Sequence, residues 1–364
     1  MTPEPPEEVS LINDQDLSWV DRAEESPEQR ARRKARFEDR KRKVRRKRRL
    51  RRAGKIGGVL LVTLLILTGI WFQWTFGGLE RMPATSGQAG LNTPGTTMLL
   101  VGGNPREADA ESIPGRGWQH DLRSSDLVML LHLTRDNRSM FVISIPAESI
   151  LPIPGKGDGT LTEALAAGGP RLYVRTVEQL SGVRLDHVAV MDMNALREIT
   201  DELGGVVLDV PREACGLPPG PRRLDGQQTL EYTANADCFP RKGLDRVERQ
   251  QSLLRGLMRG AVDGGRIANP FTVNSMLRST ASNLALEKGY SYPGMLSTLW
   301  SMRRLRTTNT TFLTVPVAEQ PFVGSGADAG IRLDAAKDAL LWDALRRDRI
   351  ADYLLLNSDA AVLR

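Results

Sequence analysis

The fold is decided by three apolar runs: MLLV at residues 98–101, LVMLLHL at 127–133 and MFVISI at 140–145. Each run has the length of a β-strand. The triplet Asp136-Asn137-Arg138 between the last two runs is typical of a tight turn, so these two runs are predicted to pair as a hairpin. Polar residues stand between and after the runs, and we expect a site where they gather at the strand ends.

Beyond these runs, strand-like and helical patterns alternate along the chain. Further strands are predicted at 187–193, 206–210 and 311–317, and helices at 171–182, 195–203, 244–262, 273–286, 294–306 and 334–347. Strands interleaved with helices predict an α/β fold, a three-layer sandwich in which helices flank both faces of a mixed central β-sheet.

The positive charge of the chain is concentrated in one segment. Residues 30–55 contain 17 Lys or Arg against Glu38 and Asp39, whereas residues 75–364 contain 32 basic and 33 acidic residues. A nearly neutral folded region argues against broad binding of nucleic acid.

The stretch IGGVLLVTLLILTGIWFQW, residues 56–74, follows the basic segment directly and carries no charge. It is long enough to cross about 30 Å of hydrocarbon, and Trp71 and Trp74 are typical of a membrane interface. A nucleic-acid-binding tract beside a buried helix is the alternative. A dense Lys/Arg cluster that abuts so long an uncharged stretch favours a single transmembrane helix with its basic flank inside.

This interpretation divides the chain into five parts. They are a disordered cytoplasmic tail with its basic juxtamembrane block at 1–55, the transmembrane helix at 56–74, a linker at 75–96, an extracytoplasmic domain at 97–350 and a C-terminal tail at 351–364. We therefore expect a single-pass protein of the plasma membrane, with its N-terminus cytoplasmic and its C-terminal domain extracellular.

The chain has two cysteines, Cys215 and Cys238, which stand 23 positions apart. In an oxidising compartment two such cysteines are predicted to form one disulfide. A metal site is the alternative, but the histidines, His120, His132 and His187, do not stand at ligand spacing.

The longest of the predicted helices carries polar residues on its apolar stripe. Arg246 and Gln250 fall on this stripe, and Arg249 lies at its edge. A guanidinium on an inward stripe needs an anionic partner. One candidate is an internal carboxylate, Asp126 or Glu148, and the other is a phosphate or pyrophosphate group, for which Arg is well suited. The opposite face is predicted to be solvated, and it carries Glu248, Arg255 and Arg259.

Asp126 stands directly before an apolar strand, in SSDLVML. An acid at such a position is commonly a turn or cap residue. In an enzyme that handles phosphate groups it would instead hold Mg²⁺, which takes carboxylate oxygens and keeps several waters. The sequence contains no Ser-His-Asp set, P-loop, HExxH or CxxC pattern.

These residues resemble the LytR-CpsA-Psr family of bacterial membrane-anchored envelope proteins, in its actinobacterial form. The resemblance covers about residues 97–349 and rests on several motifs. They are LLVGGNPR at 99–106, SDLVMLLHL at 125–133, VISIP at 142–146, GGPRLYVRTVEQLSGVRLDH at 168–187, LDGQQTLEY at 224–232 and DRVERQQ at 245–251.

The resemblance implies a phosphotransferase of cell wall biogenesis that moves a glycopolymer from a polyprenyl pyrophosphate carrier to peptidoglycan. It implies as partners the polyprenyl-phosphate-linked glycopolymer, peptidoglycan and membrane lipid, with no nucleic acid, and Mg²⁺ as cofactor. Asp126 would be the metal ligand and would form the catalytic set with Arg246 and Arg249. The implied substrate-binding residues are Arg106, Arg123 and Gln250.

The chain departs from the family pattern mainly at charged positions. Asn104 stands where the family has Asp, and arginines of the family pattern are replaced by Ser124, Ala147, Ala234 and Ala236. Arg123 is displaced by one position, Glu148 replaces Asp, and Thr160-Leu161-Thr162 replaces the KIN pattern. Because loss of one preorganised donor costs about a hundredfold in rate, these changes imply weak, altered or absent transfer.

Three hypotheses follow. The first is an active glycopolymer ligase, and the second is a catalytically impaired member that binds polyprenyl-phosphate lipid or envelope partners in a regulatory or scaffolding role. The third, a DNA-binding regulator, is disfavoured because the basic tract abuts the predicted anchor. The first hypothesis, an active ligase, predicts an apolar-walled cleft in which four arginines converge on Asp126. These are Arg106, Arg123, Arg246 and Arg249.

Overall fold

The computed structural model describes Thr63 and residues 80–82, 93–103, 125–211, 213–234, 239–241, 243–263, 265, 275–276, 284–287, 289–324 and 330–357. The chain divides into two units, 1–72 and 73–364, and the second holds the sheet and the helices that pack on it. Apart from Thr63, the predicted transmembrane helix at 56–74 lies outside the described residues. None of the described helices combines the length and the apolar character needed to cross a membrane.

A mixed sheet with strand order β1-β10-β7-β2-β3-β4-β11 forms the centre of the second unit. Its strands are β1 Glu80–Met82, β2 Thr96–Gly103, β3 Ser125–Leu133, β4 Met140–Ser144, β7 His187–Asp192, β10 Leu284–Glu287 and β11 Thr310–Thr314. β3 pairs antiparallel with β4, with Leu131 opposite Val142, which confirms the predicted hairpin. Asn137 adopts φ 57° in its turn, a conformation that Asn tolerates.

Four strands of this sheet end at the same edge. β2 runs parallel to β7, and β4 runs parallel to β11. β3 is antiparallel to both β2 and β4, so it begins where they end. We call this the carboxyl edge, and its backbone positions are Gly103, Ser125, Ser144, Asp192 and Thr314.

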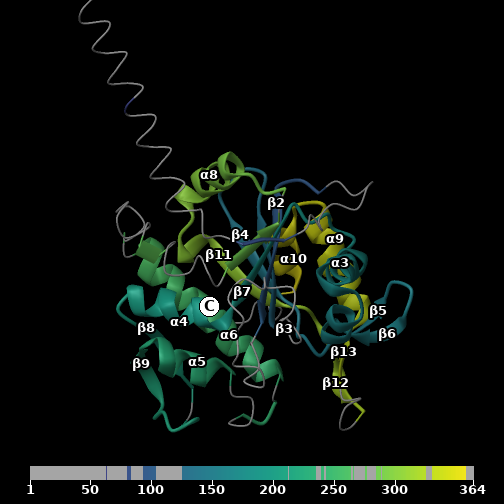
Figure 1. Cartoon of the computed structure of the whole chain (residues 1–364). Coiled ribbons are helices and arrows are strands. Elements are labelled where there is room, and N and C mark those ends of the chain that lie inside the picture. Colours follow the sequence, from purple (N-terminus) through teal and green to yellow (C-terminus); the bar gives the residue numbers. More distant parts are fainter. Residues whose placement is uncertain are drawn as a thin grey trace, which may run out of the picture. The chain divides into compact units, whose positions relative to one another are not determined.

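Three helices cover the first face of the sheet: α3 Leu161–Ser181, α9 Ala335–Arg346 and α10 Ile350–Leu356 (Figure 1). Thr160 caps α3 in a capping box with Glu163, and Gly182 ends it in the left-handed conformation, as predicted for a glycine stop. Tyr173, from α3, and Trp342, from α9, are among the large side chains buried against this face.

The second face is covered by α4 Met193–Glu202, α5 Gly226–Ala234 and α6 Gly243–Met258, together with the hairpin of β8 Val206–Val210 and β9 Gly220–Leu224 (Figure 1). Side chains alternate along β3, so Val128 and Leu130 face the first core whereas Leu127 and Met129 face the second. Helices on both faces of a mixed sheet confirm the predicted α/β sandwich.

Shorter elements complete the described chain. They are β5 Ile150–Ile153, β6 Gly157–Thr160, β12 Val317–Val323, β13 Gly330–Leu333, α8 Tyr292–Ser301, a π-helical turn Arg259–Asp263 and two 3-10 turns, Met302–Arg304 and Thr307–Asn309.

Three segments differ from the sequence-based expectation. The linker predicted at 75–96 contains a strand of the sheet, β1 Glu80–Met82, which pairs in parallel with β10, and its last residue begins β2. The helix predicted at 273–286 is wrong at its end, because residues 284–286 lie in β10, where Ala285 pairs with Val190 of β7 and is buried. Burial between two strands outweighs the weak helical preference of so short a segment. The predicted C-terminal tail begins with α10, whose Tyr353 is buried in the first core.

Candidate functional site

The most polar helix of the second face, α6, lies between two pockets. The first, the apolar pocket, has a volume of about 220 Å³ and is lined by α6, α4 and strands β2, β3 and β7. Its walls include Leu127 and Met129 from the sheet and Leu253 and Leu257 from α6, as the predicted stripe requires. Among the described lining residues, Gln250 is the one with a polar side chain, and it is buried.

Gln251 fastens α6 to the carboxyl edge. Its Nε2 donates to Ser144 Oγ at 2.9 Å, to the Leu313 carbonyl at 2.9 Å and to Thr314 Oγ1 at 3.1 Å. The side chain is buried, so these bonds replace those that water would make. Sequence reasoning missed this role, although the paired glutamines of RQQ were a signal that two polar side chains leave the helix on neighbouring faces.

Arg246 lies at the start of α6 and bonds to a carboxylate of the same chain. Its Nη2 donates to Glu148 Oε1, in the segment that follows β4. Gly243 lies close to this pair, since a Cβ there would lie 2.9 Å from Glu148 Oε2. Of the two partners considered from the sequence, an internal carboxylate or a phosphate group, the structure contains the first.

Arg249 points to the other side of α6. Its Cζ lies 3.8 Å from the ring centroid of Phe239 and 5.7 Å from that of Tyr232, and the residue is buried. Burial lowers the pKa of Arg249 to about 10, so it stays charged at neutral pH and its charge is stabilised over aromatic faces. Arg249 thus packs against aromatic rings, while the charge of Arg246 is near enough to lower its pKa as well.

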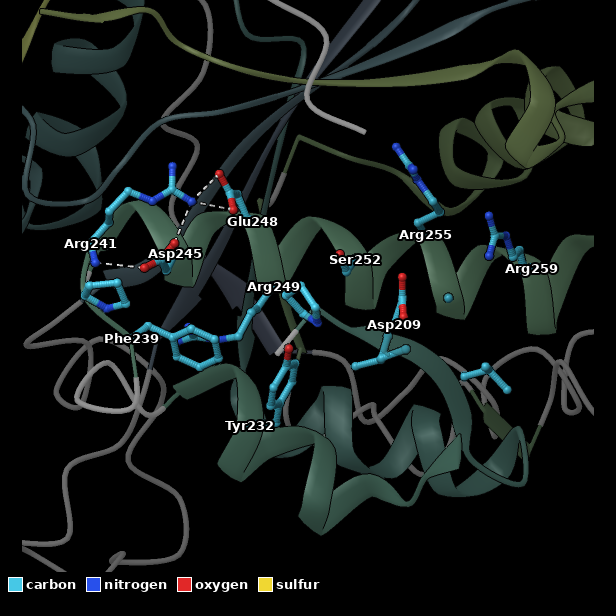
Figure 2. Close-up of a pocket in the computed structure, with 15 residues that line it drawn as sticks. Asp209, Tyr232, Phe239, Arg241, Asp245, Glu248, Arg249, Ser252, Arg255 and Arg259 are labelled. Carbon is cyan, nitrogen blue, oxygen red and sulfur yellow. Dashed lines mark hydrogen bonds and ion pairs between the residues drawn. The ribbon is translucent and has the colours of Figure 1, made fainter. Parts of the chain in front are cut away.

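The second pocket, the charged pocket, is where Arg249 lies, and it has a volume of about 600 Å³ between α6, α5 and β8 (Figure 2). At one end Arg241 bridges Asp245 at 2.6 Å and Glu248 at 2.8 Å. Burial alone would lower the pKa of Arg241, but its hydrogen bonds to Glu248 and Asp245 outweigh that effect and raise it. At the other end lie Arg255 and Arg259, which were predicted to be solvated.

Asp126 lies on β3 at an irregularity of the sheet. Leu127 pairs with Gly102 and Ser125 with Gly103, so Asp126 is the extra residue of a bulge at the carboxyl edge. Gly103 also pairs with Asp192, the last residue of β7. The backbone thus places two acids on the strands that flank β2, although their side chains lie outside the described residues. Sequence reasoning missed Asp192, whose signal was an acid closing an apolar strand.

Other predicted site residues fall outside the described part of the chain. Arg106 and Arg123 are among them, so the predicted convergence of four arginines on Asp126 stays a prediction. Cys238 is also outside it, whereas Cys215 adopts φ 51° and packs against the second core. The disulfide between them stays a prediction as well.

The carboxyl edge offers few candidates for a metal ligand. No group of three or more His, Cys, Asp or Glu side chains that could hold a metal ion occurs within the described residues. Mg²⁺ keeps several waters and is commonly held by one or two carboxylates. The pair of positions Asp126 and Asp192 is sufficient in number and type for such a site.

Comparison with known proteins places these features in a family context. The model of the LytR_cpsA_psr family matches residues 80–337. The probable cell wall biosynthesis protein LcpB of Corynebacterium glutamicum is 31% identical over 265 residues, which cover 69% of this chain and 62% of LcpB. The polyisoprenyl-teichoic acid–peptidoglycan teichoic acid transferase TagT of Bacillus subtilis is 27% identical over 227 residues, covering 58% of this chain and 67% of TagT.

Solved structures share the fold. A LytR-Csp2A-Psr enzyme from Actinomyces oris superposes with a TM-score of 0.58 at 17% identity, covering 74% of this chain and 97% of the other. TagT bound to LI-WTA superposes with a TM-score of 0.56 at 19% identity, covering 74% of this chain and 98% of the TagT chain. The chain spans 62% of LcpB and 55% of the related LcpA of Corynebacterium glutamicum, less than two thirds of either.

Proposed function

The chain belongs to the LytR_cpsA_psr family, and on this premise we propose that it transfers a glycopolymer from a polyprenyl-pyrophosphate carrier to peptidoglycan. LcpB is named for cell wall biosynthesis and TagT for teichoic acid transfer to peptidoglycan. In this proposal residues 56–74 anchor the chain in the plasma membrane with its N-terminus inside. The domain of the sheet then lies outside, where it meets membrane lipid and lipid-linked substrate.

The apolar pocket carries this proposal. A prenyl chain is a hydrocarbon and needs a dry, apolar space, which Leu, Met and Ile side chains line in the gap between α6 and the sheet. Each buried Å² of such a chain stabilises the complex by about 25 cal/mol. Methionine adapts its shape readily, so Met129 and Met258 suit a ligand of variable conformation. Gln250 would meet the polar end of the lipid.

The carboxyl edge would receive the pyrophosphate. Arg246 stands there already oriented by Glu148, and Arg106 and Arg123 are proposed to join it. Mg²⁺, held by Asp126, would supply positive charge to the phosphate oxygens. Arg249 is assigned instead to the charged pocket, where it positions α6 against Tyr232 and Phe239.

A second candidate function is a catalytically impaired member that binds polyprenyl-phosphate lipid or an envelope partner. The pairing of Arg246 with Glu148 favours it, because a guanidinium that already has a carboxylate partner has less charge to offer a phosphate. Ala147 and Ala234 add to this, since they stand where the family pattern has arginines. Lipid binding alone would not need those charges.

The transfer reaction can be tested directly on the full chain in detergent. The protein is incubated with a polyprenyl-pyrophosphate oligosaccharide, a peptidoglycan acceptor and Mg²⁺, and release of lipid phosphate is measured. We expect release by the unmodified chain and a loss of about a hundredfold or more in Asp126→Ala. Arg175→Gln, an exposed position of α3, is the matched control and should keep full activity.

Mass spectrometry of the purified chain separates the two candidate functions. Bound prenyl lipid without any release of lipid phosphate would reject transfer and support the binding function. Release that is unchanged in Asp126→Ala would remove Asp126 from the mechanism. The absence of both release and bound lipid would contradict both functions.

A further inference from the structure

The charged pocket is not used by the proposed transfer, and its two ends differ. At the first end the charges are compensated within the protein, because Arg241 binds both Asp245 and Glu248. The second end is formed by Ser252 and Arg255 of α6, Arg259 of the following π-helical turn and Asp209 of β8. Figure 2 shows the compensated group at one end of α6 and the two arginines at the other.

The polar groups of the second end have few partners in the protein. Arg259 and Asp209 are exposed, and within the described residues no ion pair involves either of them. The hydroxyl of Ser252 likewise makes no side-chain hydrogen bond to another described residue. Arg259, Asp209 and Ser252 are therefore available to a ligand that enters the pocket, whereas Arg255 already interacts with other residues of the chain.

Arg255 and Arg259 stand one helical turn apart and carry the same charge, which is an unfavourable arrangement on a helix. Burial lowers the pKa of Arg255, and the charge of Arg259 lowers it further. The guanidinium of Arg255 is also held over the ring of Phe312, with Cζ 4.8 Å from the centroid. An anion bound between the two arginines would relieve their repulsion.

The pocket also has a wall that keeps it apart from the apolar pocket. Gly256 brings α6 against β8, since a Cβ there would lie 2.3 Å from Val206 Cγ2 and 3.2 Å from Leu208 Cδ2. Leu253 and Leu257 of the same helix face the apolar pocket instead. The charged pocket is therefore a separate space from the apolar pocket, and its arginines and carboxylates favour a polar ligand.

We propose that the charged pocket binds an anionic saccharide, a sugar unit that carries a phosphate or carboxylate group. Guanidinium groups bind such anions through paired hydrogen bonds, which assigns the anionic group to Arg255 and Arg259. A carboxylate and a hydroxyl accept and exchange hydrogen bonds with sugar hydroxyls, which assigns the ring to Asp209 and Ser252. The volume of about 600 Å³ lies within the range of small-molecule sites.

Binding of the saccharide does not depend on catalysis, so it is tested by ligand-observed NMR on the full chain in detergent. The probes are glucose 1-phosphate and N-acetylmuramic acid, with N-acetylglucosamine and inorganic phosphate as references, each at millimolar concentration. Both anionic sugars, or one of them, should bind more tightly than either reference. Arg259→Gln should raise the Kd about tenfold, whereas Arg175→Gln, which removes an exposed arginine from α3, should leave it unchanged.

The variant Asp209→Asn distinguishes recognition of the sugar ring from recognition of the anionic group. This substitution should raise the Kd of the anionic sugars by a few-fold and leave the Kd of inorganic phosphate unchanged. Preference for glucose 1-phosphate would indicate a phosphate-bearing polymer, and preference for N-acetylmuramic acid a carboxylate-bearing glycan. The proposal is overturned if no probe binds, if N-acetylglucosamine binds as well as the anionic sugars, or if Arg259→Gln has no effect. If inorganic phosphate binds as tightly as the anionic sugars, the assignment of a saccharide as the ligand is overturned.

Discussion

The two faces of the central sheet are packed in different ways. On the first face, the large rings of Tyr173 from α3 and Trp342 from α9 are buried in one core with the side chains of the strands. On the second, α6 leaves a gap of about 220 Å³ and carries Gln250 and Gln251 inward, where apolar residues would pack more simply. Protein cores are normally close-packed, so a gap lined by apolar side chains lowers stability unless a ligand fills it. The first face stabilises the domain, and the second holds the site.

Both faces bury polar side chains, and on each face one of them has an oxygen without a hydrogen-bond partner among the described atoms. On α9, Asp338 is buried with its Oδ1 unpaired among the described atoms, and its neighbour Asp334 caps the helix. On α6, the Nε2 of Gln251 makes three hydrogen bonds that tie the helix to β4 and β11, while its Oε1 is unpaired among the described atoms. A polar group is stabilising where its bonds are complete and destabilising where they are not. Four predictions test whether the two faces differ as described.

The largest effect is expected from Leu254→Asp, which places a carboxylate in the apolar pocket. Burial of an unpaired charge costs several kcal/mol, so bound prenyl lipid should fall at least about a hundredfold. Mass spectrometry of the purified chain measures it, with circular dichroism as a check of folding. Leu355→Asp on α10, where the leucine is 83% exposed, is the matched control and should keep its lipid. Lipid retained by Leu254→Asp would show that the pocket is not its site.

The next effect concerns Asp338 on the first face. Burial, and then the charge of Asp334, raise the pKa of Asp338 from its ordinary 3.8 to about 7. The folded state therefore prefers the protonated acid, and the free energy of unfolding should fall as pH rises from about 4 through 7. Asp338→Asn cannot ionise, so it should gain about 2 kcal/mol relative to the unmodified chain between pH 5 and pH 8.

Urea unfolding at the two pH values measures this gain. Asp343→Asn serves as the control, because Asp343 lies on the same helix, is 42% exposed and pairs with Arg347. A gain equal in both variants would mean that the burial of Asp338 has no special effect on stability.

A third prediction concerns the attachment of α6. Gln251→Leu removes a donor from Ser144, Leu313 and Thr314 and should lower the free energy of unfolding by about 2 kcal/mol. Denaturant unfolding measures it. Gln227→Leu on α5 is the control, since Gln227 is exposed and bonds only Glu231 among the described side chains. If the two substitutions have equal effects, α6 is held by apolar packing alone.

The smallest effect is expected for Arg246 and Glu148, whose side chains are 13% and 37% exposed. A double-mutant cycle with Arg246→Gln and Glu148→Gln should give a coupling free energy of about 1 kcal/mol. The exposed pair of Arg349 and Asp352 is the reference, and its coupling should be at most about 0.5 kcal/mol. Coupling near zero between Arg246 and Glu148 would mean that Arg246 remains available to a phosphate.

The local pattern of the sequence determined much of this molecule. The runs at 127–133 and 140–145 and the turn between them specify the β3–β4 hairpin, because side chains alternate along a strand. The positions of Gln250, Leu253 and Leu257 on one stripe of α6 follow from its 3.6-residue period. The glycine at 182 ends α3 because it accepts the left-handed conformation. The alternation of strands and helices was sufficient to predict a mixed sheet covered on both faces.

Tertiary structure alone decided which groups meet. Arg246 had two candidate carboxylates in the sequence, and the course of the chain after β4 brought Glu148 to it. Arg249 was assigned to the edge of the stripe, and the packing of α5 and of the segment at 239–241 placed Tyr232 and Phe239 against its guanidinium. Arg255 and Arg259 were expected to face solvent; Arg259 is exposed, as expected, but β8 makes a pocket beside the two arginines, and Arg255 is half-buried. Periodicity is a property of neighbouring residues, whereas these contacts join segments far apart in the chain, so strand order and helix packing had to be known.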